Sequence, residues 1–328
     1  EPVSEGATAW HMGGMDGAPP TAEDFLGMEP AQSAGTGMGA TTDFDDVTLV
    51  CIPDHVHACT SPADRQTLVR QAVDHCERLG DRFVLLSTEH AGMEPESIRT
   101  PCDSPRAALF APWVCVGAFG GGTTWVPPIG HVAGVLARSD LEHGIHHEPV
   151  NEPVRGLARD ARGRALARDY DAAQRDTPGR LGVNALVVGQ RGGEGDAVRL
   201  LGALTTSTVE AYPSLAVQRF LAGVVGAIVR GTRWARFEAN DEATWQRLVR
   251  EISAFLETLW SSGALQGCTP QEAFSVTCDA STSTPADRHN GRAIVLLLMA
   301  LAPPASAVVS LPITVEAGVM PDPAAASG

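Results

Sequence analysis

Two cysteines and two histidines follow one another closely, in the order Cys51, His55, His57 and Cys59. Thiolate sulfur and neutral imidazole nitrogen are the atoms that bind zinc in most protein sites. A zinc ion held here could serve a metal-dependent hydrolase. The spacing matches no established zinc module, however, and the residues come directly after a predicted strand. We therefore favour an ordinary strand-to-loop connection and expect no bound metal.

A second group of polar side chains combines His143, His146 and His147 with Glu148. Histidine and glutamate can bind a metal or exchange protons near neutral pH. The group follows a predicted helix, and a polar loop explains it equally well. We expect these histidines to be exposed or bonded to the backbone.

The glycine clusters at Gly35 (GTGMGA) and Gly117 (GAFGGG) lack the spacing of a dinucleotide-binding loop. A lysine-bearing phosphate loop is impossible, because the chain has no lysine. Hinges or turns are the simpler interpretation. The sequence predicts no catalytic residue and no cofactor.

Composition indicates a soluble globular protein, since 44% of the 328 residues are hydrophobic and 19% are charged. The net charge of −15 disfavours nucleic acid and anionic membrane surfaces as partners. Seven cysteines without a repeating frame favour reduced thiols in the cytoplasm. No signal peptide is evident, and we expect no apolar run long enough to cross a bilayer. The exclusive use of arginine suggests a bacterial, GC-rich genome.

The elements that must position these residues alternate between strand and helix. A strand at Asp46–Ile52, a helix at Ser61–Gly80 and a strand at Phe83–Ser87 form a βαβ unit, which indicates a parallel sheet. Further strands are predicted at Pro112–Ala118 and Val183–Val188. A helix begins near Pro127 and Pro128, and the charged segment 155–175 is predicted to lie on the surface. The fold class is therefore α/β.

Two strongly apolar helices, Pro213–Arg230 and Asp241–Ser261, precede three predicted strands at Phe274–Cys278, Ala293–Met299 and Val308–Val315. Apolar residues of the second helix recur at helical spacing, and we expect Trp245, Ile252, Phe255 and Leu259 to be buried. The predicted organisation is a loop-rich segment (1–45), an α/β domain (46–208), a C-terminal core domain (209–315) and a flexible tail (316–328).

Several phrases resemble, in their order, the tail-sheath proteins of contractile phage tails and related bacterial injection systems. The most specific phrase is VPPIGHVAGVLARSD (126–140); others are DGAPPTAEDFLG (16–27), DVTLVCIPD (46–54), LGVNAL (181–186), FEANDEATWQRLVREISAFLETLWSSGALQG (237–267) and EAFSVTCD (272–279). The resemblance covers about Asp16 to Val315. The family's Trp-Gly-Ala-Arg-Thr phrase is replaced by LGALT (201–205), and its N-terminal Pro-Gly-Val-Tyr phrase is absent.

This resemblance implies a structural subunit with a sheath-type core of mixed sheets flanked by helices. It implies self-assembly into stacked hexameric rings around an inner tube, with baseplate and cap proteins as further partners. The expected setting is a cytoplasmic assembly or a phage-like particle. No enzyme activity, no cofactor, no nucleic-acid partner and no direct membrane insertion are expected.

Two sets of assembly residues follow from this interpretation. The terminal strand is expected to pair between subunits through Val308, Val309, Leu311, Ile313 and Val315. Arginines on the polar side of the helix Asp241–Ser261, Arg247 and Arg250, could contact the tube. Two alternatives stay open: a soluble α/β metal-dependent hydrolase, and a sheath-like protein confined to the baseplate or tail end.

Overall fold

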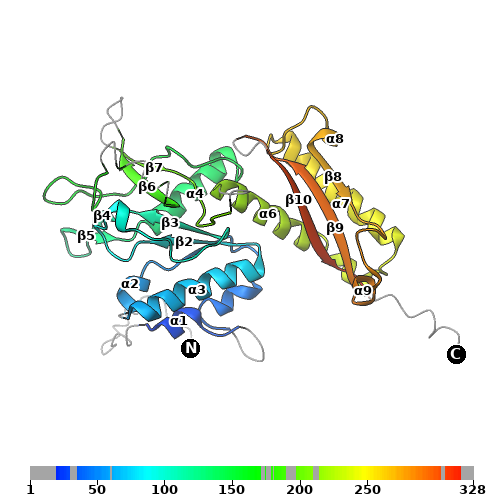
Figure 1. The fold of residues 1–328 in the computed structure, drawn as a ribbon, viewed down its shortest axis with the longest axis horizontal. Helices are drawn as coiled ribbons and strands as arrows, with labels where there is room; N and C mark the ends of the chain where they lie inside the picture. The colour runs from blue at the N-terminus through cyan, green and yellow to red at the C-terminus, as the bar shows by residue number, and fades with distance from the viewer. Residues whose placement is uncertain are drawn as a thin grey trace, which may run out of the picture.

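The computed structural model describes residues 20–29, 35–59, 61–170, 174, 179, 181–189, 197–209, 214–303 and 307–318. The chain forms two lobes that are joined by one long helix, α6 (Leu215–Gly231) (Figure 1). We call them the first lobe, which precedes α6 in the chain, and the C-terminal lobe. Residues 1–19 and 319–328, which include most of the predicted tail, lie outside the described residues.

A five-stranded sheet forms the centre of the first lobe, with the strand order β1-β2-β3-β6-β7. The first four strands are parallel, and β7 joins antiparallel to β6. Their side chains are apolar on both faces, as expected for a sheet that is covered on both sides. The strands are β1 (Leu49–Cys51), β2 (Phe83–Ser87), β3 (Ala107–Ala111), β6 (Val183–Val188) and β7 (Val198–Leu201).

Two helices cover the two faces of this sheet. On one face α3 (Pro62–Leu79) packs through Ala72, Val73 and Cys76 against alternate strand residues such as Val84 and Leu109. On the other face α4 (Ile129–His143) packs against the intervening residues, including Phe83 and Phe110. Ser61 caps α3 through Ala63 N, and Gly80 ends it at a φ of 74°. The predicted βαβ unit is confirmed.

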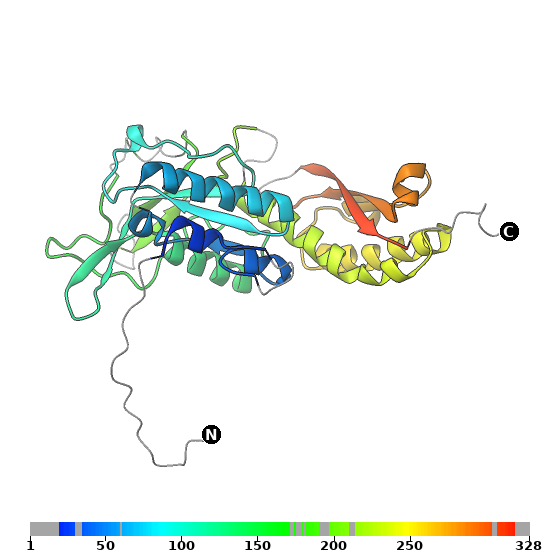
Figure 2. The ribbon, with the colours of Figure 1, turned by 90° about the horizontal axis from the view of Figure 1, so that it is seen from below.

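Smaller elements surround the sheet. Next to α3 lie α1 (Ala22–Leu26) and α2 (His55–Ala58), with the 3₁₀ turns η1 (Gly39–Asp43) and η2 (Pro95–Ser97). A two-stranded hairpin, β4 (Val114–Gly117) and β5 (Thr123–Val126), projects from the lobe (Figure 2).

The C-terminal lobe is a three-stranded antiparallel sheet with helices on one face (Figure 2). Its strand order is β10-β9-β8, so the longest strands are neighbours. The elements are η3 (Arg233–Phe237), α7 (Glu242–Ser261), α8 (Pro270–Ala273), β8 (Phe274–Thr277), α9 (Pro285–His289), β9 (Arg292–Ala300) and β10 (Val308–Glu316).

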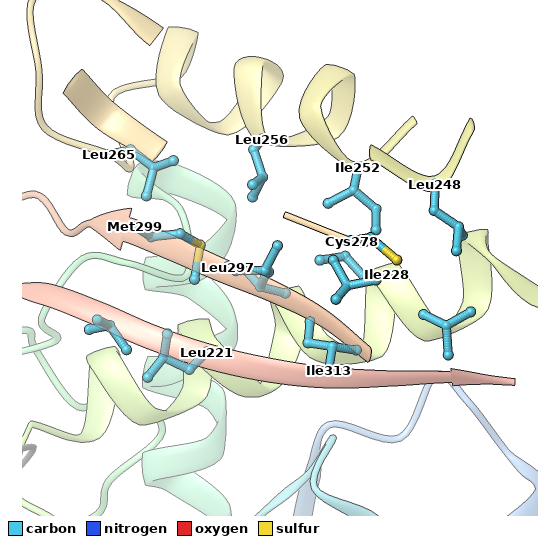
Figure 3. Packing of buried hydrophobic residues seen from close by; sticks show 14 of the residues in the cluster. Leu221, Ile228, Leu248, Ile252, Leu256, Leu265, Cys278, Leu297, Met299 and Ile313 are labelled. Atoms are coloured by element: carbon cyan, nitrogen blue, oxygen red, sulfur yellow. The ribbon is translucent and has the colours of Figure 1, made fainter. Parts of the chain in front are cut away.

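The core of this lobe lies between the sheet and the helices α6 and α7 (Figure 3). From the strands come Leu297, Met299 and Ile313, and from α7 come Leu248 and Leu256, which are fully buried. The predicted apolar stripe of α7 is confirmed in part. Trp245 and Ile252 are buried, whereas Phe255 and Leu259 lie at the margin of the core and are only partly buried.

Helix α6 belongs to both lobes. Leu215, at its start, packs in the first lobe, while Val224 and Ile228 pack in the C-terminal core. By length and composition alone, Leu215–Phe237 could cross a membrane, so the expectation that no run is long enough was wrong. Of its most apolar window, 67% is buried inside the molecule, which is typical of a core helix.

Candidate functional site: assembly surfaces

The strand β10 pairs within its own chain. Nine residues, Val308 to Glu316, are in antiparallel register with β9, from Ala300 to Arg292. Side chains on its inner face enter the core: Val309, Ile313 and Val315 are 2–3% exposed. The predicted inter-subunit strand is thus also an integral part of its own subunit's sheet and core.

The outer edge of β10 has no strand partner among the described residues, because β9 is its sole neighbour in the sheet. Pro312 lies in the middle of this edge strand, opposite Leu296. Proline lacks the backbone N–H group and is tolerated where that position faces away from the ladder. A strand added at this edge would lose one donor at Pro312. Pairing between subunits through β10 therefore stays a prediction about this edge.

The outer face of the C-terminal sheet is another surface that sequence reasoning missed. On β9, Ile294, Leu296 and Leu298 point away from the helices, because alternate residues of a strand face opposite sides. Ile294 and Leu296 are partly buried, and Leu298 is 40% exposed. The predicted strand looked uniformly apolar, and that pattern did not distinguish a sheet with one open face from one covered on both.

The two arginines proposed to contact a tube differ in their surroundings. Arg247 stacks on Trp234, with its guanidinium carbon 3.7 Å from the ring centroid, and pairs with Glu251 at 2.9 Å. A second carboxylate, that of Glu238, lies 3.6 Å away. Arg247 is therefore held by its own subunit. Arg250 is exposed on α7 and is the better placed of the two to meet a partner.

The four residues of the first cluster are placed differently from one another. The buried His55 donates from Nδ1 to Ile52 O over 2.7 Å, and the exposed His57 packs edge-on against Trp113. Burial raises the pKa of Cys51 to about 11 and also raises the pKa of Cys59, so both thiols are held protonated. Within the described residues, no three His, Cys, Asp or Glu side chains converge as metal ligands.

The histidine group after α4 serves local packing. His143 and His147 are exposed and their rings stack at 4.6 Å, while the half-buried His146 packs against Phe220. Glu148 accepts a 2.8 Å hydrogen bond from Ser214 Oγ, the residue that caps α6. The arrangement positions the start of α6, and Ser139 Oγ in α4 lies 3.4 Å from Nδ1 of the exposed His147.

Comparison with known proteins agrees with this architecture. Residues 207–306 match the family model for the phage tail sheath C-terminal domain. This match covers less than half of the chain. The matched segment includes α6, α7, β8 and β9, the elements that build the C-terminal core. No curated protein sequence shows significant similarity to the chain.

The fold of nearly the whole chain is that of sheath proteins. A protein in the anti-feeding prophage baseplate structure superposes with a TM-score of 0.64 at 20% identity, covering 85% of this chain and 74% of that one. A protein in the contracted PVC sheath complex, an extracellular contractile injection system, superposes with a TM-score of 0.60 at 24% identity, covering 81% of this chain and 70% of that one. The sheath tail protein of Desulfitobacterium hafniense superposes with a TM-score of 0.59 at 15% identity, covering 85% of this chain and 58% of that one. The resemblance read from the sequence is confirmed.

Proposed function

We propose that this chain is a structural sheath subunit of a contractile injection system or phage-like tail. It polymerises around an inner tube and contracts to drive that tube forward. The observation that carries the proposal is the sheath C-terminal domain at residues 207–306, within a chain of which 81–85% superposes on proteins from contractile particles.

The surfaces of the C-terminal lobe support an assembly role. Among the described residues, β10 has one edge without a strand partner and β9 has an apolar outer face, both built on a packed core. Exposed strand edges favour pairing with another chain. Such features suit a protein whose work is repeated contact with copies of itself in stacked hexameric rings.

Further proposed partners are the inner tube, the baseplate and the cap proteins. For the tube contact we favour Arg250 over Arg247, since Arg247 already pairs with two carboxylates. Arg250→Glu should weaken co-assembly with the tube protein and leave the isolated fold unchanged. Arg247→Glu is a poorer probe, because it also removes the stacking on Trp234.

Electron microscopy of the chain, alone and co-expressed with an inner-tube protein of a contractile injection system, tests the proposal. We expect wild-type protein to form helical or ring-stacked polymers with a central lumen. Charged residues in place of Ser310 and Thr314 on β10 should abolish these polymers. Monodisperse protein that forms no ordered polymer with or without the tube protein would contradict the proposal.

A baseplate or tail-end role is the second candidate, favoured by the similarity to a protein in a baseplate structure. Gold labelling of intact particles separates the two roles: label along the shaft indicates the main sheath, and label confined to one end indicates the baseplate. The metal-dependent hydrolase alternative gains no support from the side chains, since within the described residues no three His, Cys, Asp or Glu side chains converge as metal ligands.

A further inference from the structure

The first lobe carries an exposed aromatic side chain at the tip of the β4–β5 hairpin. Phe119 is fully exposed, and it precedes three glycines, Gly120 to Gly122, whose φ angles are all positive. Only glycine adopts such angles at little cost, so these residues make the tight turn that presents Phe119. The hairpin projects away from the sheet (Figure 2), and none of the residues that the structure describes covers the ring.

A groove of about 380 Å³ runs along β1 in the same lobe. Because β1 is the end strand of the sheet, one of its edges has no strand partner among the described residues. The wall is mainly apolar and includes Phe25, Met38, Val47, Leu49, Val50 and Ile52. Pockets of this size accept an aromatic side chain readily. One chain therefore has both a projecting apolar group and an apolar recess.

Charge distinguishes the two features. Residues 20–54, which form the groove, contain seven acidic residues and no arginine, and Asp24 and Asp54 lie exposed on its rim. Residues 155–168 contain five arginines and a single aspartate. Like charges would keep two grooves apart, whereas the groove of one copy and the arginine segment of another attract each other.

The arginine segment lies beside the hairpin. Cys115 N in β4 donates to Ala165 O at 2.8 Å, and Cys115 O accepts from Ala158 N at 2.9 Å. The guanidinium of Arg164 lies 5.5 Å from the centre of the Trp125 ring in β5. Arg155, Arg159 and Arg162 are exposed along the same segment. The hairpin that presents Phe119 is thus flanked by positive charge, as a partner with an acid-rimmed apolar groove requires.

We propose that Phe119 of one subunit docks in the β1 groove of a second copy, and that the arginines of 155–168 face its acidic rim. The contact joins two different patches, so it is head-to-tail and repeats from copy to copy. Repetition of such a contact builds a ring or a helical array. This inference rests on the proposed sheath function, and it assigns one contact between subunits to surfaces outside the sheath C-terminal domain.

Cysteine cross-linking tests the contact directly. In full-length protein with the exposed Cys268 and the groove residue Cys51 changed to Ser, Arg162→Cys combined with Asp54→Cys keeps Phe119 in place and should give disulfide-linked multimers on mild oxidation. Neither substitution alone should do so. The matched control is Phe237→Cys with Asp54→Cys, because Phe237 is also exposed, at 90%, but lies in η3 of the other lobe. Equal cross-linking of the control pair, or none with the test pair, would overturn the proposal.

Charge reversal gives an independent readout. Arg162→Glu should weaken self-association in sedimentation velocity by about tenfold, and adding Asp54→Arg should restore it. Phe119→Ser should weaken it at least as much, with an unchanged melting temperature, since the side chain contacts nothing in its own fold. Self-association should also decline as salt is raised. Failure of Asp54→Arg to rescue Arg162→Glu would contradict the proposed pairing.

The outcomes separate this inference from the sheath function. Ordered tubes formed by Phe119→Ser as readily as by wild type would reject the docking and leave the sheath function standing. Cross-linked multimers from a chain that never forms ordered polymers would support the docking and reject the sheath function. Binding of wild type, but not of Phe119→Ser, to anionic phospholipid vesicles without cross-linking would reject the docking in favour of a membrane contact.

Discussion

The sheets of the two lobes bury their side chains in opposite ways. In the first lobe, β2 and β3 are buried at every position, because α3 and α4 cover both faces. In the C-terminal lobe, β10 alternates between buried and exposed residues, because α6 and α7 both lie on one face. One sheet is closed to partners on its faces, while the other offers a face and an edge.

This difference separates two ways in which a sheet can make contacts with a partner. A sheet covered on both faces can form contacts only through its edges, loops and outer helices, as the β1 groove and the β4–β5 hairpin illustrate. A sheet with one open face presents backbone and apolar side chains together. The C-terminal lobe, which contains most of the segment similar to the sheath C-terminal domain, is the lobe whose core strands also form part of its exposed surface.

The largest expected effect comes from removing β10. Deleting the chain from Val308 onward would expose the core that Val309, Ile313 and Val315 cover, at about 1.5–3 kcal/mol for each buried side chain. We expect the C-terminal lobe to unfold and the protein to aggregate, as judged by circular dichroism and solubility. Asparagine at the outward-facing Ser310 and Thr314 is the matched control and should be neutral. A deletion variant that stays soluble and fully folded would contradict the view that β10 completes the core of the C-terminal lobe.

Cavities in the two cores should cost similar amounts. Leu256→Ala in α7 and Leu109→Ala in β3 each remove a fully buried side chain, and each should lower the free energy of unfolding by about 2–5 kcal/mol. Phe255→Ala, one residue away at the margin of the core, should cost clearly less than Leu256→Ala despite its larger side chain. Chemical denaturation measures all three, and a larger loss for Phe255→Ala would show that α7 is rotated.

The ion pair between the lobes provides a smaller effect. Arg219 in α6 is 3% exposed and binds both carboxylate oxygens of Asp140 in α4, at 3.1 and 2.5 Å. Arg219→Met should cost about 1–3 kcal/mol, because the carboxylate that loses its partner is still partly hydrated. Differential scanning calorimetry should then resolve two transitions in place of one. A single transition at an unchanged temperature would show that the lobes are coupled elsewhere.

Acid should loosen the first lobe before the C-terminal lobe. The pKa of His75 lies below its ordinary value of 6.5, first because burial desolvates the ring and then because Arg82 and Arg78 repel its charged form. The pKa values of His55 and His131, in the same lobe, are lowered too, chiefly by burial. Below pH 6.5 the unfolded chain binds more protons than the folded one, so the free energy of unfolding decreases as the pH is lowered.

This loss should begin near pH 6.5 and continue as the pH falls through the lowered folded-state pKa values of these histidines. His75→Gln should reduce the slope of unfolding free energy against pH by a measurable fraction, and His289→Gln, on the exposed end of α9 in the C-terminal lobe, is the control. Hydrogen exchange at pH 5 should show β2 and β3 losing protection before β9. The reverse order would contradict the assignment.

Sequence reasoning succeeded where local pattern and tertiary environment agree. The helix α3, with its Ser61 cap and Gly80 stop, and the strand β2 were predicted within a residue. It missed β3, whose AALFA sequence has three alanines and little strand preference; β3 exists because β2 and β6 flank it. It also missed β7, which pairs antiparallel with β6.

Long-range contacts explain the other misses. The charged segment 155–175 was predicted to lie on the surface, yet Leu166 and Tyr170 are buried, because Leu166 bridges to Val114 in β4. The glycine run at 117–122 indicated a turn but not that Phe119 is exposed at its tip. The residues of the β1 groove come from α1, η1 and β1, and their convergence has no local signature.

Helix α6 also determines how force is transmitted between the two lobes. Its start is packed in one hydrophobic core and its end in another, so force applied to either lobe passes along a rod held at both ends. Pulling the lobes apart along the described helix would require Leu215 or Ile228 to leave its core, which shears packed side chains. We therefore expect the subunit to act as a stiff strut, in which a displacement imposed on one lobe is passed to the other with little elastic loss.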